Sequence, residues 1–438
     1  MKFARRLFLI IFTVSALLGS GGTFADPFAL LGWDINADLK SWTPLPIAFT
    51  SLEIGLIVVA VVWLLRDAAQ KRKHPFVPGA LFGPMLWLCA ALVVGVLWGM
   101  LRGSVSTTIV GFELRGFAML VMGYLMVGML LRDERDLAMV VRGTLIACTG
   151  LALDNLYRFY VVLGSHIPND LAYDHDDSVV LGFGFILCLA LLAFRGTRGQ
   201  RLWAGLLLPL TIWCMMIMQR RAAFAVLGIG CVILAILLYR LRPKVFWRTV
   251  PVLSLILGAY LVVFWHSEST IGQPARAISS LFSPDPRDAA SNQYRDIERI
   301  DIINNIRSSR VLGLGFGQAY TMYWPLPDLS FWPFWHFETH NSDLWIWMDG
   351  GVPVFFTFWL VIGIGSYVGG RELARRREEW SLAQVGLRRR GNRRVVGVGH
   401  RMHAQLVHPP SRARAVAPIA PVAPVEETAP GLAEPLSR

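Results

Sequence analysis

His340 lies where a long polar segment of the chain meets an apolar one. Residues 339–351 read THNSDLWIWMDGG, and the apolar run that follows begins at about residue 344. An ionisable side chain at a membrane boundary is costly unless it is partnered or hydrated, so its presence there points to function. Chemistry on a lipid-borne substrate is the function that suits this place. A helix cap or an interfacial residue is the alternative interpretation of a single histidine.

A second polar feature is the hairpin Gln219-Arg220-Arg221 between two apolar runs. A guanidinium group is planar and always charged, and it binds phosphate or carboxylate through paired hydrogen bonds. Two adjacent arginines at this place therefore predict an anion site. Snorkelling of both side chains to the lipid headgroups is the alternative.

The composition of the chain is that of a membrane protein. Hydrophobic residues make up 54% of the 438 residues, and 16 of them are tryptophan, which is too apolar for an ordinary soluble fold. A helix needs about 20 apolar residues to cross the hydrocarbon core. Runs near this length lie at 7–22, 47–65, 79–101, 114–131, 137–155, 179–194, 202–218, 222–239, 249–265 and 344–368. We therefore expect an all-α, polytopic membrane helix bundle with about ten transmembrane helices.

Basic residues follow every second run, which fixes the expected orientation. They place both termini in the cytoplasm and the net charge of +12 mostly on cytoplasmic loops, where it meets anionic membrane lipids rather than nucleic acid. The expected parts are nine helices within 1–265, a large extracytoplasmic loop at 266–343, the last helix at 344–370 and a cytoplasmic tail at 371–438. Cleavage of residues 1–25 as a signal peptide is the alternative for the first run.

The large loop is long enough to be a functional element. Residues 293–307 have the pattern of an amphipathic helix, with Ile297, Ile300, Ile303 and Ile306 on one side. Gly313, Gly315 and Gly317 predict a tight turn rather than a dinucleotide site, because no strand and helix flank them. We expect no metal site. The cluster at 174–177 is acidic, but contiguous residues do not converge on one ion, so a solvated loop is the expectation there.

These features resemble the O-antigen ligase and O-antigen polymerase superfamily of bacterial envelope glycan assembly. The family signature is His, then Asn, Ser or Gln, nine residues, Gly, two residues and a small or polar residue. Here it reads His340, Asn341, nine residues, Gly351, Val352, Pro353 and Val354, and Val354 departs from the pattern. The run 310–317 is similar to the family's glycine-rich stretch, and Arg221-Ala222-Ala223 is similar to its outer hairpin, with Arg220 in place of a serine. Arg295 lies where the family has a second essential arginine. The resemblance covers about 50–368.

The resemblance implies transfer of a glycan from an undecaprenyl diphosphate carrier to an acceptor hydroxyl, without a metal or other cofactor. The acceptor is lipid A-core, a growing polysaccharide or a protein, and the site lies on the periplasmic face of the inner membrane. His340 would be the base, because imidazole is easily tuned to neutral pH. Arg221 and Arg295 would stabilise the leaving diphosphate, with Arg220 and Arg299 as neighbours. Asn341 and Asp343 would orient the imidazole or the acceptor.

Two questions stay open at this level. A transporter or a flippase for lipid-linked oligosaccharides would also need many spans and arginines, but it predicts charged or broken helices at the membrane midplane. The tail has clustered arginines and then many prolines, and such a composition does not bury a core. Relatives commonly have further spans after the signature helix, so we expect either a natural truncation or a shifted reading frame.

Overall fold

The structure is a computed structural model that describes residues 2–18, parts of 57–69, 78–165 without 104, and 175–375 without 268, 285 and 328–333. All regular structure in these residues is helical, as predicted. Seven described helices are long and apolar enough to cross a membrane, so the chain is a multi-pass membrane protein. The prediction of ten spans is not confirmed at that number: two further apolar helices are shorter, and the run 47–65 lies mostly outside the described residues.

Each of the other predicted runs falls on a helix. The α-helices are α1 (Lys2–Leu18), α3 (Phe82–Arg102), α4 (Thr107–Leu130), α5 (Glu134–Tyr157), α6 (His175–Ala193), α7 (Arg198–Met218), α8 (Arg221–Leu241), α9 (Pro243–Phe264), α10 (Gln273–Ser279), α11 (Pro286–Ser308) and α12 (Ser342–Arg375). One π-helical turn, Arg158–Val162, extends α5, and a 3-10 turn, Thr270–Gly272, precedes α10.

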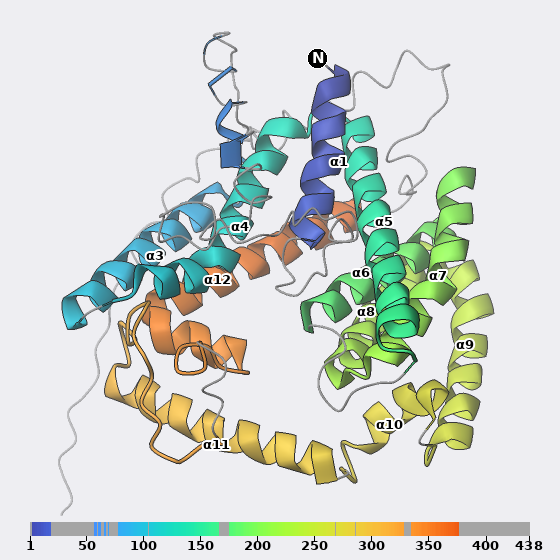
Figure 1. Cartoon of the computed structure of the whole chain (residues 1–438). Helices are drawn as coiled ribbons and strands as arrows, with labels where there is room; N and C mark the ends of the chain where they lie inside the picture. The colour runs from blue at the N-terminus through green and yellow to red at the C-terminus, as the bar shows by residue number, and fades with distance from the viewer. Residues whose placement is uncertain are drawn as a thin grey trace, which may run out of the picture.

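The helices form two groups, which Figure 1 shows on the left and on the right. In one group α3, α4 and α12 share a core around Leu88, Phe117 and Val354. In the other, α5 to α8 pack around Leu145 and Met215. None of the residues of α9 is buried, and most of its leucine and valine side chains are exposed, which suits a helix that faces lipid.

Two helices connect the groups at opposite ends of the bundle. α1 packs against α5 and also against α4. At the other end, α11 lies across the bundle outside both groups, running from α10 toward α12 (Figure 1). α11 covers the predicted amphipathic helix at 293–307 and begins seven residues before it.

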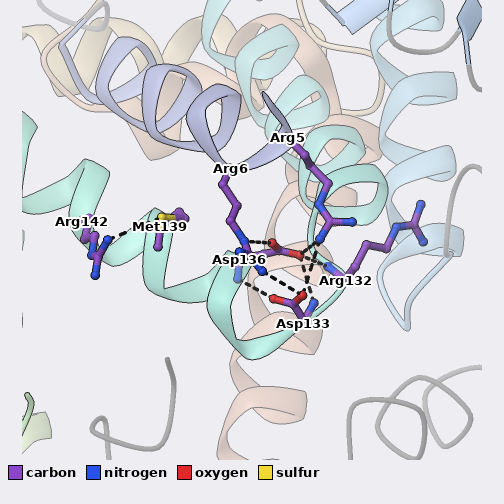
Figure 2. Close-up of polar contacts among 7 residues, drawn as sticks. All are labelled: Arg5, Arg6, Arg132, Asp133, Asp136, Met139 and Arg142. Carbon is purple, nitrogen blue, oxygen red and sulfur yellow. Dashed lines mark hydrogen bonds and ion pairs between the residues drawn. The ribbon is translucent and has the colours of Figure 1, made fainter. Parts of the chain in front are cut away.

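Charged side chains fix α1 to the start of α5 (Figure 2). The carboxylate of Asp136 is completely buried and receives Arg5 Nη2 at 2.6 Å and Arg6 Nε at 3.2 Å. Asp133 caps α5 by accepting the backbone N–H of Asp136, and it also pairs with Arg6. Burial acts to raise the pKa of Asp133, but this N–H group and the two guanidinium charges together lower it. Arg5 and Arg6, before the first apolar run, therefore meet Asp133 and Asp136, after the fourth apolar run. Both segments were predicted to be cytoplasmic.

The acidic cluster at 174–177 is not the solvated loop that we expected. His175 to Asp177 form the first turn of α6, and Asp177 is buried. An acidic residue is stable there because the N-terminus of a helix carries a partial positive charge. Asp174 lies outside the described residues.

Replacing Asp136 tests the attachment of α1. Asp136→Asn should lower the free energy of unfolding by about 3 kcal/mol, because it leaves two partly buried guanidinium groups without their buried carboxylate. The measurement is thermal unfolding in detergent. Glu134→Gln removes a charge from the same helix turn and is the matched control. Equal melting temperatures for the two variants would show that the ion cluster does not hold α1.

Candidate functional site

The buried face of α11 carries polar side chains beside Ile302 and Ile306, and these polar groups organise the surrounding loop. Asp301 Oδ1 accepts the backbone N–H groups of Tyr323 and Trp324 at 3.1 and 3.0 Å. Asn305 accepts the N–H of Thr321 at 2.9 Å and donates to its carbonyl at 2.7 Å. The predicted isoleucine face is wrong in part, since Ile300 is exposed while Glu298, Asp301 and Asn305 are buried. The physical reason is that a buried loop needs partners for its backbone polar groups.

His340 is bound to this face through Glu298. The backbone N–H of His340 donates to Glu298 Oε2 at 3.0 Å, and His340 Nδ1 lies 3.1 Å from Oε1. The carboxylate is almost fully buried, with 2% of its side chain exposed, whereas 40% of the His340 side chain is exposed. The tyrosine ring of Tyr294, one turn earlier on α11, meets the imidazole edge to face at 5.2 Å between centroids. The histidine is therefore held from one side and accessible from the other.

Asn341 and Asp343, which we expected to orient the imidazole or the acceptor, occupy the start of α12. Asn341 Oδ1 accepts the backbone N–H of Leu344 at 3.1 Å, which is the hydrogen bond of a helix N-cap. Asp343 is exposed in the first turn of the helix. The contact with the imidazole nitrogen is made by Glu298, which the sequence analysis did not select.

Arg221 is the first residue of α8, and it reaches the beginning of α11. Its Nη2 donates to Asn292 Oδ1 at 3.1 Å, and its Nη1 lies 3.5 Å from Asp288 Oδ2. Gln219 has a left-handed backbone conformation and Arg220 an extended one, so the predicted hairpin is confirmed as a tight turn between α7 and α8. Arg220 is half-buried in this turn.

Arg295 lies between the two contacts of α11. Residues three or four apart are neighbours on a helix surface, and Arg295 is three residues after Asn292 and three before Glu298. Its side chain is exposed and forms no ion pair within the described part of the chain. Arg299 is exposed as well, but it pairs with Asp296 at 3.2 Å. The structure thus brings Arg221, Arg295 and His340 to one helix and places Arg299 in a surface ion pair beside them.

The signature glycine, Gly351, breaks α12. Its backbone has φ 65° and ψ −172°, a region that only glycine enters readily. The glycine-rich loop closes the break, because Leu314 and Gly315 donate their N–H groups to the carbonyls of Met348 and Asp349 at 2.6 and 2.9 Å. On its other side this loop is held by α4, where the buried Glu113 accepts the N–H of Gly317 at 2.6 Å. The loop that we predicted as a tight turn is packed between α3, α4 and α12.

The nine residues between Asn341 and Gly351 form the first part of α12. Its N-terminus carries His340, and its C-terminal carbonyls are held by the loop. The nine-residue spacing of the signature is therefore the length of one short helix. This helix fixes the distance between His340 and the glycine-rich loop along the axis of α12.

Replacing Gly351 tests this anchoring. A Cβ atom at Gly351 would collide with the carbonyl of Val311 and with Leu312, and the backbone conformation itself costs a non-glycine residue about 1–3 kcal/mol. Gly351→Ala should lower the melting temperature. The control is Gly363→Ala in the same helix, where the added methyl group meets nothing within 4 Å. A Gly351→Ala protein as stable as the control would contradict the anchoring.

Comparison with known proteins supports the resemblance seen in the sequence. Residues 206–359 match the model of the family described as O-Antigen ligase. No curated protein and no solved structure matches the chain. The matched segment begins within α7, contains Arg221, α11 and His340, and ends within α12. The chain is therefore a multi-pass membrane protein in which residues 206–359 are similar to the O-antigen ligase family.

Proposed function

We propose that this protein transfers a glycan from an undecaprenyl diphosphate carrier to an acceptor hydroxyl, at the periplasmic face of the bacterial inner membrane. The family match supports an O-antigen ligase- or polymerase-type membrane enzyme. The observation that carries the finer proposal is the arrangement along α11. This helix holds Arg221 of α8 through Asp288, carries the exposed Arg295, and binds His340 through the buried Glu298.

The residues match the requirements of the reaction. The acceptor oxygen forms a bond to the anomeric carbon, the bond from that carbon to the diphosphate oxygen breaks, and the hydroxyl proton passes to His340. Negative charge grows on the leaving diphosphate, and fixed cations stabilise it most when they are already in place. Arg221 is such a cation, because Asp288 and Asn292 hold its guanidinium group. Arg295 adds a second charge on the side of the histidine.

The start of α8 supports a site for the diphosphate. The unpaired N–H groups in the first turn of a helix attract an anion, and they disfavour a cation. Arg220 and Arg221 nevertheless occupy this position. A diphosphate bound there would interact with the N–H groups and with the guanidinium group of Arg221, which Asp288 and Asn292 already hold in place.

The transporter alternative predicts broken helices at the membrane midplane, and α12 is indeed broken at Gly351. In transporters the ends of a broken helix face a substrate or an ion. Here the carbonyls at the break receive N–H groups of the glycine-rich loop, so the protein itself fills the break. This observation favours the enzyme. The choice between ligase and polymerase depends on the acceptor: cells that lack the gene should accumulate unligated lipid-linked polymer in the first case and single repeat units on the core in the second.

The first functional prediction concerns His340. His340→Ala should lower glycan transfer by at least about 100-fold, because the base that accepts the hydroxyl proton is lost. The assay uses purified protein in proteoliposomes with a lipid-linked glycan donor, and membrane insertion is checked by fractionation. His266→Ala, at the exposed end of α9, is the control and should keep full activity. Full transfer by His340→Ala would refute the assigned base.

The second functional prediction concerns Arg221. Arg221→Lys should lose most of the transfer activity, because an ammonium group does not reproduce paired hydrogen bonds to a diphosphate. Arg240→Lys, at the opposite end of the same helix, is the matched control. Wild-type turnover of Arg221→Lys in the same assay would support the snorkelling interpretation instead.

A further inference from the structure

Glu298 is a buried carboxylate with a defined relation to the candidate base. Both of its oxygens face His340, one toward the backbone N–H and the other toward Nδ1. The backbone hydrogen bond fixes the carboxylate independently of the imidazole. The imidazole therefore meets an acceptor whose position does not depend on its own protonation.

This geometry selects one form of the imidazole. A carboxylate only accepts hydrogen bonds, so the nitrogen that faces it must carry the proton. In the neutral ring the proton then lies on Nδ1, and Nε2 has a free lone pair. Since 40% of the His340 side chain is exposed while Glu298 is buried, the lone pair belongs to the accessible part of the ring.

Tyr294 encloses the same pair. Burial, together with the charge of Glu298 and a hydrogen bond to it, raises the pKa of Tyr294 to about 12. The phenol therefore keeps its proton at neutral pH and supplies a third donor to the carboxylate, beside the backbone N–H and Nδ1 of His340. The aromatic ring of Tyr294 also lies edge to face against the imidazole of His340. This contact limits rotation of the imidazole away from Glu298.

We propose that Glu298 is the positioning residue of the transfer reaction: it holds His340 with the proton on Nδ1 and leaves Nε2 to accept the proton of the acceptor hydroxyl. The inference rests on the proposed role of His340 as base. After proton transfer the ring is positively charged, and the carboxylate stabilises that charge without taking the proton. Glu298 touches neither substrate in this scheme and acts through the histidine.

The variant that tests this is Glu298→Gln. The amide has the shape of the carboxylate, and its oxygen still accepts the backbone N–H of His340. Its NH₂ group then faces Nδ1 and donates to it, which moves the ring proton to Nε2 and removes the base. The analogous exchange in a catalytic triad lowers kcat by about 10⁴-fold. We expect kcat to fall by at least about 100-fold and KM to change little. The control is Asp296→Asn, on the exposed side of α11, which should keep the wild-type kcat.

A spectroscopic measurement keeps the test independent of activity. Nitrogen-15 signals of His340, assigned by their loss in His340→Ala, should show a protonated Nδ1 and a bare Nε2 in the neutral wild-type ring. The reverse should hold in Glu298→Gln. A wild-type ring protonated on Nε2, or a folded Glu298→Gln protein with wild-type kcat, would overturn the role of Glu298. Full activity of His340→Ala would instead refute the proposed function, whatever the tautomer.

Discussion

The polar contacts that α11 makes near its start and near its middle determine the geometry of the candidate site. Near its start, Asp288 and Asn292 hold Arg221 of α8. Two turns further on, Glu298 holds His340 at the entrance to α12. α8 and α12 belong to different helix groups of the bundle (Figure 1). Arg221 and His340, the proposed phosphate-binding cation and the proposed base, are therefore positioned relative to each other by one helix outside both groups.

A second constraint fixes the position of His340 along the axis of α12. The helix that follows His340 ends at the break of Gly351, and the backbone of the glycine-rich loop closes that break. The same loop is hydrogen-bonded to α4 by Glu113 and continues to the buried polar face of α11. Loop, α11 and the first part of α12 thus form one hydrogen-bonded unit. Such support is what a catalytic side chain needs, because small displacements of a reacting group are costly.

The parts that could be predicted from the sequence are those that depend on local properties. The apolar runs predicted the helices because length and hydropathy are enough for a membrane span, and the Gln219-Arg220-Arg221 hairpin and the helix in the large loop followed from neighbouring residues. Glu298 could not be found in this way, since its partner is 42 residues further on and its burial follows from the packing of the loop. The isoleucine pattern misled for the same reason, and the spacing of Glu298, Asp301 and Asn305 along one helix face was the available signal. The pairing of Arg5 and Arg6 with Asp136 is likewise a contact across the fold.

We propose that α11 places the diphosphate of the donor beside Arg221 and Arg295, with the transferred sugar toward Nε2 of His340. A structure of the protein in lipid nanodiscs with an undecaprenyl diphosphate-linked glycan tests it most directly. We expect the diphosphate to contact the guanidinium group of Arg221 at the start of α8 and the anomeric carbon to lie on the exposed side of His340. A diphosphate bound away from α11, with Arg221 still paired only to Asp288 and Asn292, would contradict it.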